Sequence, residues 1–279
     1  MNLYRLFAAC FLIFDTKGSV IRIRIDMVFQ EQFANNKIRY RFRYPNTALY
    51  MRPYIKAVQG DEYDILASEE YIEKQRPYFT ECMEDAYVEY KALIELTSKF
   101  LLPRRTCIFH AVAFCWKGYA WLLTGPSGAG KTTQYKKWKT TYRDEVRMIC
   151  GDMPLLEWRE DGSIWVHPTP WNGKERIQGK ISAPLAGIVI LEQHKMNSIE
   201  RMVPDVSGMS LLLQMAMLPE TEGEIILMVN MLNRLLQACP VWKLMNRGDA
   251  ASVLMTANAF DEYLKNAGEK KAINETKDT

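Results

Sequence analysis

Apolar and charged residues alternate with a period of two in two segments near the start of the chain. Residues 20–26 read Val-Ile-Arg-Ile-Arg-Ile-Asp, and residues 37–44 read Lys-Ile-Arg-Tyr-Arg-Phe-Arg-Tyr. This alternation predicts β-strands, each with one apolar and one charged face. Both charged faces are basic, which is typical of a solvated sheet face. The alternative is a docking surface for an acidic peptide or protein.

A helical pattern follows over residues 68–100. Ser68 is placed to cap the first helix, because two glutamates follow it in what would be the first turn. Pro77 is expected to split or begin a helix. Pro103 then breaks the pattern, so we expect an N-terminal β-rich and helical domain of uncertain role over residues 1–104.

Beyond residue 105, short apolar strands alternate with helical stretches, which predicts an α/β core. The expected strands cover residues 118–124, 146–150, 186–192 and 241–245, with a hairpin over 155–166 around Asp161-Gly162. The expected helices follow Asp205 and cover residues 222–239 and 250–265. This second domain would span residues 105–267 and end in a polar, disordered tail over 268–279.

Composition places the chain among ordinary globular proteins. Its 279 residues are 48% hydrophobic and 25% charged, enough to bury a sizeable core. The 36 Lys and Arg exceed the 33 Asp and Glu by too little to predict nucleic-acid binding. The apolar run over residues 6–14 is shorter than the ~20 residues that a membrane span needs, and no cleavage site follows it. We expect neither a nucleic-acid nor a membrane partner.

The spacing of the cysteines predicts neither a metal site nor a redox motif. All 6 are scattered, without a CxxC pair or the spacing of metal ligands. In a chain of this length, the pattern indicates reduced and mostly buried thiols, and we expect a cytoplasmic protein.

The strongest chemical signal is a complete match to GxxxxGK[ST] between a predicted strand and a predicted helix. A loop of this type binds the phosphates of a nucleoside triphosphate. The expected binding residues are Gly125, Pro126, Ser127, Gly128, Ala129, Gly130, Lys131, Thr132 and Thr133.

The chemistry explains these residue types. Glycines let the backbone turn its N–H groups inward as a nest for phosphate oxygens, and the following helix adds the positive end of its dipole. Lys131 supplies a mobile positive charge for the β- and γ-phosphates, and the Thr132 hydroxyl can ligate Mg²⁺. ATP and Mg²⁺ are therefore the expected cofactors.

Phosphoryl transfer also needs an acidic group, and two candidates follow predicted strands. Asp152 ends the strand over residues 146–150, and Glu192 ends the more apolar strand over 186–192. Ligands of parallel α/β sheets lie at the carboxyl ends of strands, so either position is suitable. Either residue can instead be a helix cap or a solvated loop residue.

Several strings together resemble the catalytic domain of the HPr serine kinase/phosphorylase family. They are His110-Ala-Val-Ala, the loop 125–133, Cys150-Gly-Asp-Met-Pro154, Thr169-Pro-Trp-Asn-Gly-Lys174 and Ser182-Ala-Pro-Leu185. The chain looks most like the stand-alone members of bacterial gene clusters that modify ribosomal peptides, including lasso-peptide precursor kinases. The resemblance covers roughly residues 105 to 260.

The resemblance implies roles for individual residues. Ser127, Lys131 and Thr132 fall on positions that bind phosphate and Mg²⁺. His110 falls on a histidine near the phosphates, and Asp152 on the general base toward the acceptor hydroxyl. The implied fold is an α/β P-loop core of the HPr kinase C-terminal or phosphoenolpyruvate-carboxykinase-like type. A homo-oligomer is also implied.

The sequence departs from the family pattern at two positions. HPr kinases usually carry two adjacent aspartates, and Gly151 stands here in the first place. Pro126 stands where those kinases often have aspartate.

The residues themselves support compatible roles. Asp152 can act as the base, and His110 can bind phosphate, tune Asp152, or be a core histidine. Residues 169–176 are rich in turn formers and predict an active-site loop, with a plain surface turn as the alternative. In such a loop Trp171 would be the anchor and Glu175 a metal ligand, while Lys174 and Arg176 would hold phosphate.

We therefore expect a kinase acting on a hydroxyl, most simply a serine of a protein or precursor peptide. One alternative is a small-molecule hydroxyl kinase on the same scaffold, and another is a nucleotide-binding module without turnover. An ATP-binding cassette ATPase is a further alternative, because its loop can have this sequence and residues 188–192 can be its Walker B strand. No LSGGQ-like signature precedes Ile188, however, and no aspartate precedes Glu192.

Overall fold

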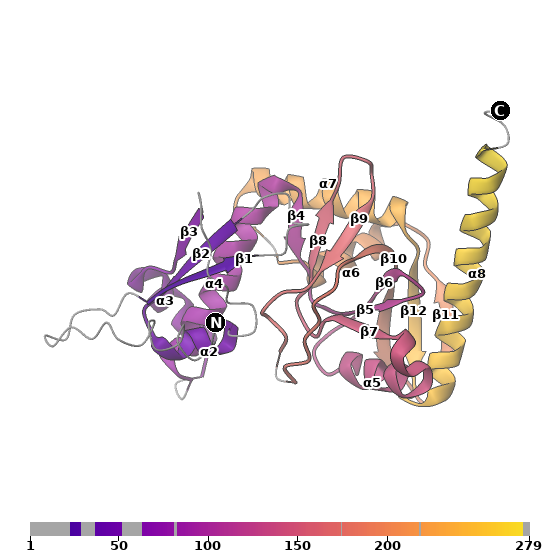
Figure 1. Cartoon of the computed structure of the whole chain (residues 1–279), viewed down its shortest axis with the longest axis horizontal. Helices are drawn as coiled ribbons and strands as arrows, with labels where there is room; N and C mark the ends of the chain where they lie inside the picture. The colour runs from indigo at the N-terminus through magenta and orange to yellow at the C-terminus, as the bar shows by residue number, and fades with distance from the viewer. Residues whose placement is uncertain are drawn as a thin grey trace, which may run out of the picture. The chain divides into compact units, whose positions relative to one another are not determined.

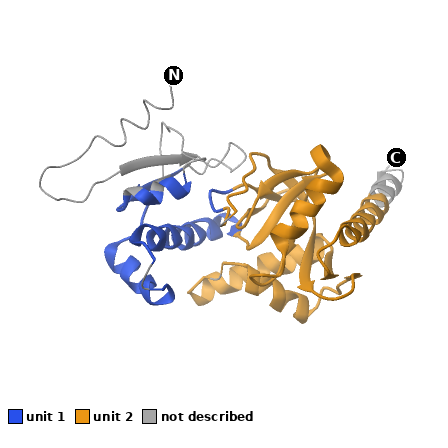
Figure 2. Ribbon diagram, turned by 90° about the horizontal axis from the view of Figure 1, so that it is seen from below, with its two compact units in different colours: residues 1–107, 169–171 blue, residues 108–168, 172–279 orange. Residues whose placement is uncertain are grey.

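The computed structural model describes residues 23–28, 37–51, 63–80, 83–173, 175–217 and 219–275. The chain divides into two compact units (Figure 2). The first comprises residues 1–107 with 169–171, and the second comprises residues 108–168 with 172–279. The continuous part of the first unit ends at Cys107, whereas the sequence placed the domain boundary after residue 104.

The first unit combines a small sheet with helices. Strand β2 (Lys37–Phe42) pairs antiparallel with β1 (Ile23–Val28) and parallel with β3 (Tyr63–Leu66). The helices are α2 (Pro45–Met51), α3 (Glu69–Gln75) and α4 (Asp85–Leu101), with 3₁₀ turns η2 (Arg76–Tyr78) and η3 (Leu102–Arg104). The two strands expected from the alternating pattern are confirmed over the described residues, and residues 20–22 of the first expected strand lie outside them.

Local chemistry explains the helical part of this unit. The Ser68 side chain accepts a hydrogen bond from the backbone N–H of Tyr71, so the expected cap of α3 is confirmed. Pro77 lies within η2, where the helix is interrupted. The buried Tyr40 of β2 bonds through its hydroxyl to Thr97 of α4 at 2.8 Å, which joins sheet and helix.

The second unit is built on a large mixed sheet. Its strands are β4 (Thr106–Ile108), of which Ile108 belongs to this unit, β5 (Ala111–Trp116), β6 (Tyr119–Thr124), β7 (Arg147–Cys150), β8 (Leu155–Trp158), β9 (Ile164–His167), β10 (Ala183–Gln193), β11 (Ser198–Arg201) and β12 (Val241–Asn246). Their order is β4-β8-β9-β10-β6-β5-β7, with β12 also paired to β10 and β11 paired to β12. Strand β10 runs parallel to β6 and β12, whereas β5 runs antiparallel to β6 and β7.

Helices α5 (Lys131–Tyr142) and α8 (Ala250–Glu275) pack together against this sheet (Figure 1). The core beneath them is aromatic: the rings of Trp121 and Phe260 stack with centroids 3.6 Å apart, and Trp138 stacks on Phe260. Alternate residues of the same strands, such as Ala113 and Ile188, point to the opposite face and are also buried. Both faces of the sheet are therefore covered, and the unit has a mixed α/β architecture.

Most of the expected elements of this unit are confirmed. The hairpin of β8 and β9 turns at Gly162, whose φ is 82°. Asp205 caps α6 (Val206–Met215), and Thr221 caps α7 (Glu222–Ala238). The helix expected to stop near residue 265 instead continues to Glu275, through part of the segment expected to be a disordered tail. Its last residues are mostly helix formers, and one glycine costs a helix only about 1 kcal/mol.

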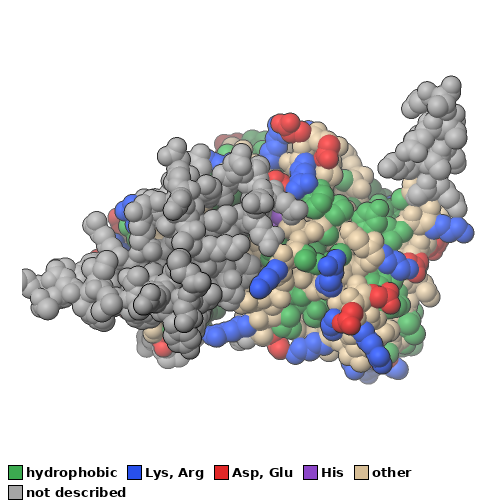
Figure 3. All heavy atoms as spheres, in the orientation of Figure 1, with side chains coloured by type: hydrophobic (Ala, Val, Ile, Leu, Met, Phe, Trp, Pro, Cys, Tyr) green, Lys and Arg blue, Asp and Glu red, His purple; other side chains and the backbone are tan. Residues whose placement is uncertain are grey.

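The described cysteines fit the expectation of reduced, buried thiols. Cys107, Cys115, Cys150 and Cys239 are all free and buried, and Cys10 and Cys82 lie outside the described residues. No helix within the described ranges is long and apolar enough to cross a membrane. Figure 3 shows Lys and Arg side chains scattered over the visible face of the second unit, with Asp and Glu between them.

Candidate functional site

The site begins at a glycine-rich turn between β6 and α5. Gly125, Gly128 and Gly130 have φ values of 138°, 83° and 93°, which side-chain-bearing residues rarely adopt. A Cβ atom at residue 125 would also lie 2.8 Å from the backbone oxygen of Leu191 on β10. The glycines therefore fix both the curvature of the turn and its close approach to the neighbouring strand.

Backbone N–H groups at this turn are left without acceptors. Among the described residues, none accepts a hydrogen bond from the N–H of Gly128, Gly130, Lys131 or Thr132. These donors lie at the N-terminus of α5, where the helix dipole adds positive potential. A cluster of this kind is suited to bind an anion such as phosphate.

The side chain of Lys131 lies against the same turn. Its residue is only 8% exposed, and Nζ donates hydrogen bonds to the backbone oxygens of Gly125 at 2.9 Å and Pro126 at 3.2 Å. Burial lowers the pKa of Lys131, and the nearby charge of Asp152 opposes that effect. A positive charge is thus held beside the unpaired N–H groups.

His110 and Asp152 meet at the same edge of the sheet. In the antiparallel pairing of β5 with β6, Ala111 lies opposite Thr124, so the beginning of β5 is beside the end of β6. Nε2 of His110 lies 3.3 Å from Oδ1 of Asp152, and the two side chains are 30% and 26% exposed. The Thr124 hydroxyl donates to the backbone oxygen of His110 at 2.7 Å, which fixes the histidine next to the turn.

Glycine is required at residue 151 for a steric reason. A Cβ atom there would lie 2.5 Å from the backbone oxygen of Ile177 and 3.2 Å from that of Asn172. The Gly151 N–H also donates to the Asn172 side chain at 3.2 Å. The segment after Asn172 therefore occupies the space that a second aspartate would need.

The predicted loop over residues 169–176 lies partly against Asp152. A Cβ atom at Gly173, where φ is 65°, would be 3.1 Å from the Asp152 side chain. Trp171 is buried, as expected of an anchor, while Lys174 lies outside the described residues. Glu175 pairs with Lys136 of α5 at 2.7 Å. Lys136 lies one helical turn after Thr132, so Glu175 is held near the start of that helix.

Glu192, the second acidic candidate, has a different environment. It pairs with Lys243 of β12 at 2.8 Å, and this hydrogen bond lowers the pKa of the Glu192 carboxyl. Both residues line a cavity of about 520 Å³ beside the turn. The rest of its lining comes from residues 125–129, the end of β10 at Ile190, Leu191 and Gln193, and from Leu211, Gln214 and Met215 of α6.

Sequence reasoning missed the contribution of α6 and β12 to this region. Lys243 is a single charged residue in an otherwise apolar strand, Val-Trp-Lys-Leu-Met, and this was the available signal. Gln193 donates to the backbone oxygen of Gly128 at 2.7 Å, a contact between distant segments that no local pattern reveals.

The described residues contain no cluster of three or more His, Cys, Asp or Glu side chains that could hold a metal ion. This is compatible with Mg²⁺, which commonly uses one or two carboxylates together with substrate phosphates and water. Oxygen ligands in this region include the Thr132 hydroxyl and the carboxylates of Asp152 and Glu175, while the Glu192 carboxylate lines the cavity beside the turn.

No protein-family model matches the sequence, and a search of curated proteins finds no match. Among solved structures, the HPr(Ser) kinase/phosphatase from Coxiella burnetii is similar at 13% sequence identity with a TM-score of 0.33. The comparison covers 60% of this chain and 96% of that one.

Proposed function

We propose that the chain is an ATP- and Mg²⁺-dependent kinase that transfers a phosphoryl group to a hydroxyl, namely a serine of a protein or precursor peptide. The observation that carries this proposal is the meeting of three groups at one sheet edge. They are the unpaired N–H groups of the turn, the buried cation Lys131, and the carboxylate of Asp152 beside His110. Residues 105–267 would then be a P-loop kinase domain of the HPr kinase type.

The turn would bind the triphosphate. The N–H groups of Gly128, Gly130, Lys131 and Thr132 would donate to phosphate oxygens, as they have no acceptor among the described residues. Lys131 would exchange the backbone oxygens of Gly125 and Pro126 for the β- and γ-phosphates. This places positive charge where the transferring group carries negative charge.

Asp152 would accept the proton of the attacking hydroxyl. A base must lie within hydrogen-bond reach of the acceptor, and Asp152 lies near enough to Lys131 for their charges to interact. His110 would orient the carboxylate through the 3.3 Å contact between Nε2 and Oδ1. Because both side chains are partly exposed, an acceptor on a large molecule can approach them, which favours a peptide over a small molecule in a closed pocket.

Mg²⁺, when bound, would neutralise charge on the phosphates. The donor set fits this ion, because the Thr132 hydroxyl and the carboxylates of Asp152 and Glu175 are hard oxygen ligands. Glu175 would have to leave Lys136, with which it forms an exposed ion pair. Exposed pairs of this kind contribute at most about 1 kcal/mol, so moving Glu175 from Lys136 to the ion would cost little free energy.

A phosphotransfer assay tests the proposal. The intact protein, Mg²⁺ and γ-labelled ATP would be incubated with serine-containing peptides, and products would be resolved by mass. We expect peptide phosphorylation that falls by about 10²-fold or more in Asp152→Asn, the usual contribution of a general base. Asp144→Asn is the matched control, because the Asp144 side chain is fully exposed on η4 (Arg143–Glu145).

Other outcomes of this assay identify the alternatives. Transfer to free serine or glycerol, but to no peptide, would indicate a small-molecule kinase. ATP binding without transfer to any acceptor, with equal affinity in Asp152→Asn, would contradict a kinase and indicate a nucleotide-binding module.

A further inference from the structure

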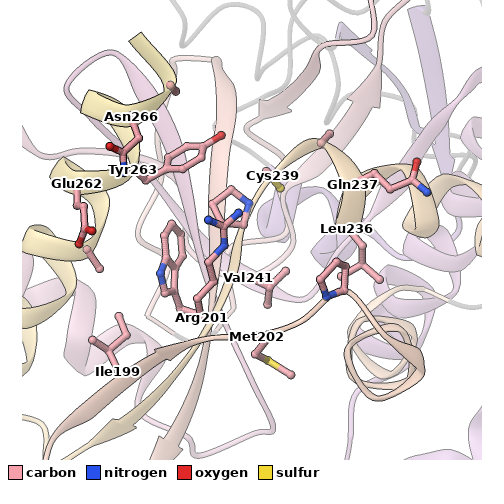
Figure 4. Close-up of a pocket in the computed structure, with 16 residues that line it drawn as sticks. Ile199, Arg201, Met202, Leu236, Gln237, Cys239, Val241, Glu262, Tyr263 and Asn266 are labelled. Atoms are coloured by element: carbon pink, nitrogen blue, oxygen red, sulfur yellow. The ribbon is translucent and has the colours of Figure 1, made fainter. Parts of the chain in front are cut away.

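A second cavity, of about 780 Å³, lies in the other half of the large sheet (Figure 4). It opens to solvent and is lined by the end of α7, the beginning of β12, strand β11 and the middle of α8. Because β12 and β6 both run parallel to β10, the beginning of β12 lies at the edge opposite to the turn that follows β6. The cavity is therefore separate from the candidate kinase site, and the two share no lining residue.

The deeper wall of this cavity is apolar, because Leu236, Val241 and Trp242 are buried there. Its outer lining is exposed and polar, with the side chains of Arg201, Gln237, Glu262 and Asn266. Cys239 also lines the cavity, but its thiol donates to the backbone oxygen of Leu235, and burial raises its pKa to about 12. Cys239 is thus a neutral wall residue rather than a nucleophile or a metal ligand.

A single cation faces these walls. In Figure 4 the Arg201 side chain extends across the cavity, with Tyr263 beyond its guanidinium group. Arg201 forms no ion pair with any described residue, and Glu262, the acidic residue of the lining, lies to the side of it in Figure 4. Burial raises the pKa of Tyr263, so its hydroxyl is protonated at neutral pH and can donate a hydrogen bond.

These features define the class of ligand. One guanidinium with a neighbouring hydroxyl donor matches one carboxylate, which arginine binds through two parallel N–H groups. A nucleotide or another polyanion would need more than one cation. A peptide would bring backbone amides against the buried wall of Leu236, Val241 and Trp242, which offers few side-chain hydrogen-bond partners.

We propose that this cavity binds a small apolar monocarboxylate, of the size of a medium-chain fatty acid, with its carboxylate on Arg201 and its carbon chain against the apolar walls. The volume lies in the range of about 300–1,000 Å³ that is typical of small-molecule sites. Strand β12 connects the two cavities, because Val241 and Trp242 line this one and Lys243 lines the other.

The test is a calorimetric titration of the full chain with decanoate below its micelle-forming concentration, with decanol and acetate as comparison ligands. We expect saturable binding of one decanoate, and affinities at least tenfold weaker for decanol, which lacks the charge, and for acetate, which lacks the chain. Arg201→Gln should weaken decanoate binding about tenfold or more, the usual effect of removing a charge-assisted contact. Arg147→Gln, at an exposed position of β7, is the matched control and should bind as the unchanged protein does.

A cavity-filling variant tests the location independently. Ala259→Phe should abolish decanoate binding while leaving the far-ultraviolet circular dichroism unchanged. The proposal is overturned by absence of saturable binding, by decanol binding as tightly as decanoate, or by unchanged affinity in Arg201→Gln. If Ala259→Phe does not fold, the comparison ligands and Arg201→Gln still decide the result.

Discussion

At the scale of residues, Gly151 adjoins the candidate base Asp152 and has no room for a side chain. A Cβ atom there would lie 2.5 Å from the backbone oxygen of Ile177 and 3.2 Å from that of Asn172. The lack of a second carboxylate beside Asp152 is thus built into the packing of residues 172–177 against β7. It leaves Asp152 as the carboxylate at this turn of the chain.

We predict that Gly151→Ala destabilises the protein by about 1–3 kcal/mol, the usual cost of overpacking. Gly223→Ala is the control, because nothing lies within 4 Å of the added Cβ and the position is in the first turn of α7. Urea unfolding measures both variants. Equal free energies of unfolding for Gly151→Ala and the unchanged protein would contradict this, because residues 172–177 would then move aside without loss of stability.

A buried histidine outside the site predicts a dependence of stability on pH. His167 is fully buried and contacts Ser182 through Nδ1 at 2.8 Å and Glu157 through Nε2 at 3.1 Å. Burial holds the pKa of His167 below its usual value, although Glu157 opposes this. Burial alone would raise the pKa of Glu157, but hydrogen bonds with His167 and Arg159 hold it below its usual value.

The direction of this pH dependence follows from which state, folded or unfolded, takes up protons more readily. As the pH falls below about 6.5, the unfolded chain protonates this histidine before the folded chain does, so acidification favours unfolding. Glu157 acts in the same direction at lower pH, because its carboxyl also protonates more readily in the unfolded chain. We predict that the free energy of unfolding in urea decreases from pH 7.5 to 5, and decreases less in His167→Gln. An equal or larger decrease in His167→Gln would contradict this assignment.

At the scale of elements, helix α6 extends from its N-cap at Asp205 to the candidate site. Asp205 accepts a hydrogen bond from the N–H of Gly208 at 3.0 Å, and the other end of the helix lines the cavity beside the turn. The backbone oxygen of Met215 also accepts a hydrogen bond from the N–H of His110 at 2.7 Å. The position of α6 therefore affects both the cavity and the histidine.

We predict that Asp205→Ala lowers the stability by about 1 kcal/mol, the typical value of an N-cap. Asp205→Asn should keep most of that stability, because asparagine caps helices about as well as aspartate does. The midpoints of urea unfolding report the difference. If both variants lose the same amount, the charge of Asp205 matters more than its hydrogen bond.

Elements with a local signal were predictable from the sequence, and those defined by distant partners were not. Asp161-Gly162 indicated the hairpin, and Asp205 the start of α6. By contrast, β10 begins at Ala183 rather than at 186, because Ala183 pairs with Val166 of β9. Strand β11 is mostly exposed and polar, and it is a strand because it pairs with β12, so its sequence alone gave no strong pattern.

The same distinction applies to the candidate site. The GxxxxGK[ST] pattern is local, and it predicted the turn and the position of Lys131. The hydrogen bond from Gly151 to Asn172, the ion pair of Glu192 with Lys243, and the contribution of α6 all join segments far apart in the sequence. A single sequence contains no record of such pairings.

At the scale of the whole molecule, the second unit holds both inferred binding regions at opposite edges of one sheet. The aromatic core between α5, α8 and the strands lies between these edges and includes Trp121, Trp138, Trp242 and Phe260. The two cavities share no lining residue, and coupling between two sites requires an element with two discrete arrangements that both ligands bias. Decanoate binding and ATP binding are therefore predicted to be separable by mutation.

The central claim is that the turn over residues 125–130 and Lys131 bind a nucleoside triphosphate, and calorimetric titration with MgATP tests it most directly. We expect the full chain and Lys137→Ala to bind MgATP equally, because Lys137 is exposed on the outer side of α5. Lys131→Ala should fold normally and bind at least about tenfold more weakly, since it loses a charge-assisted contact to phosphate. Equal MgATP affinity in Lys131→Ala and Lys137→Ala, or no binding to the unchanged protein, would contradict the account.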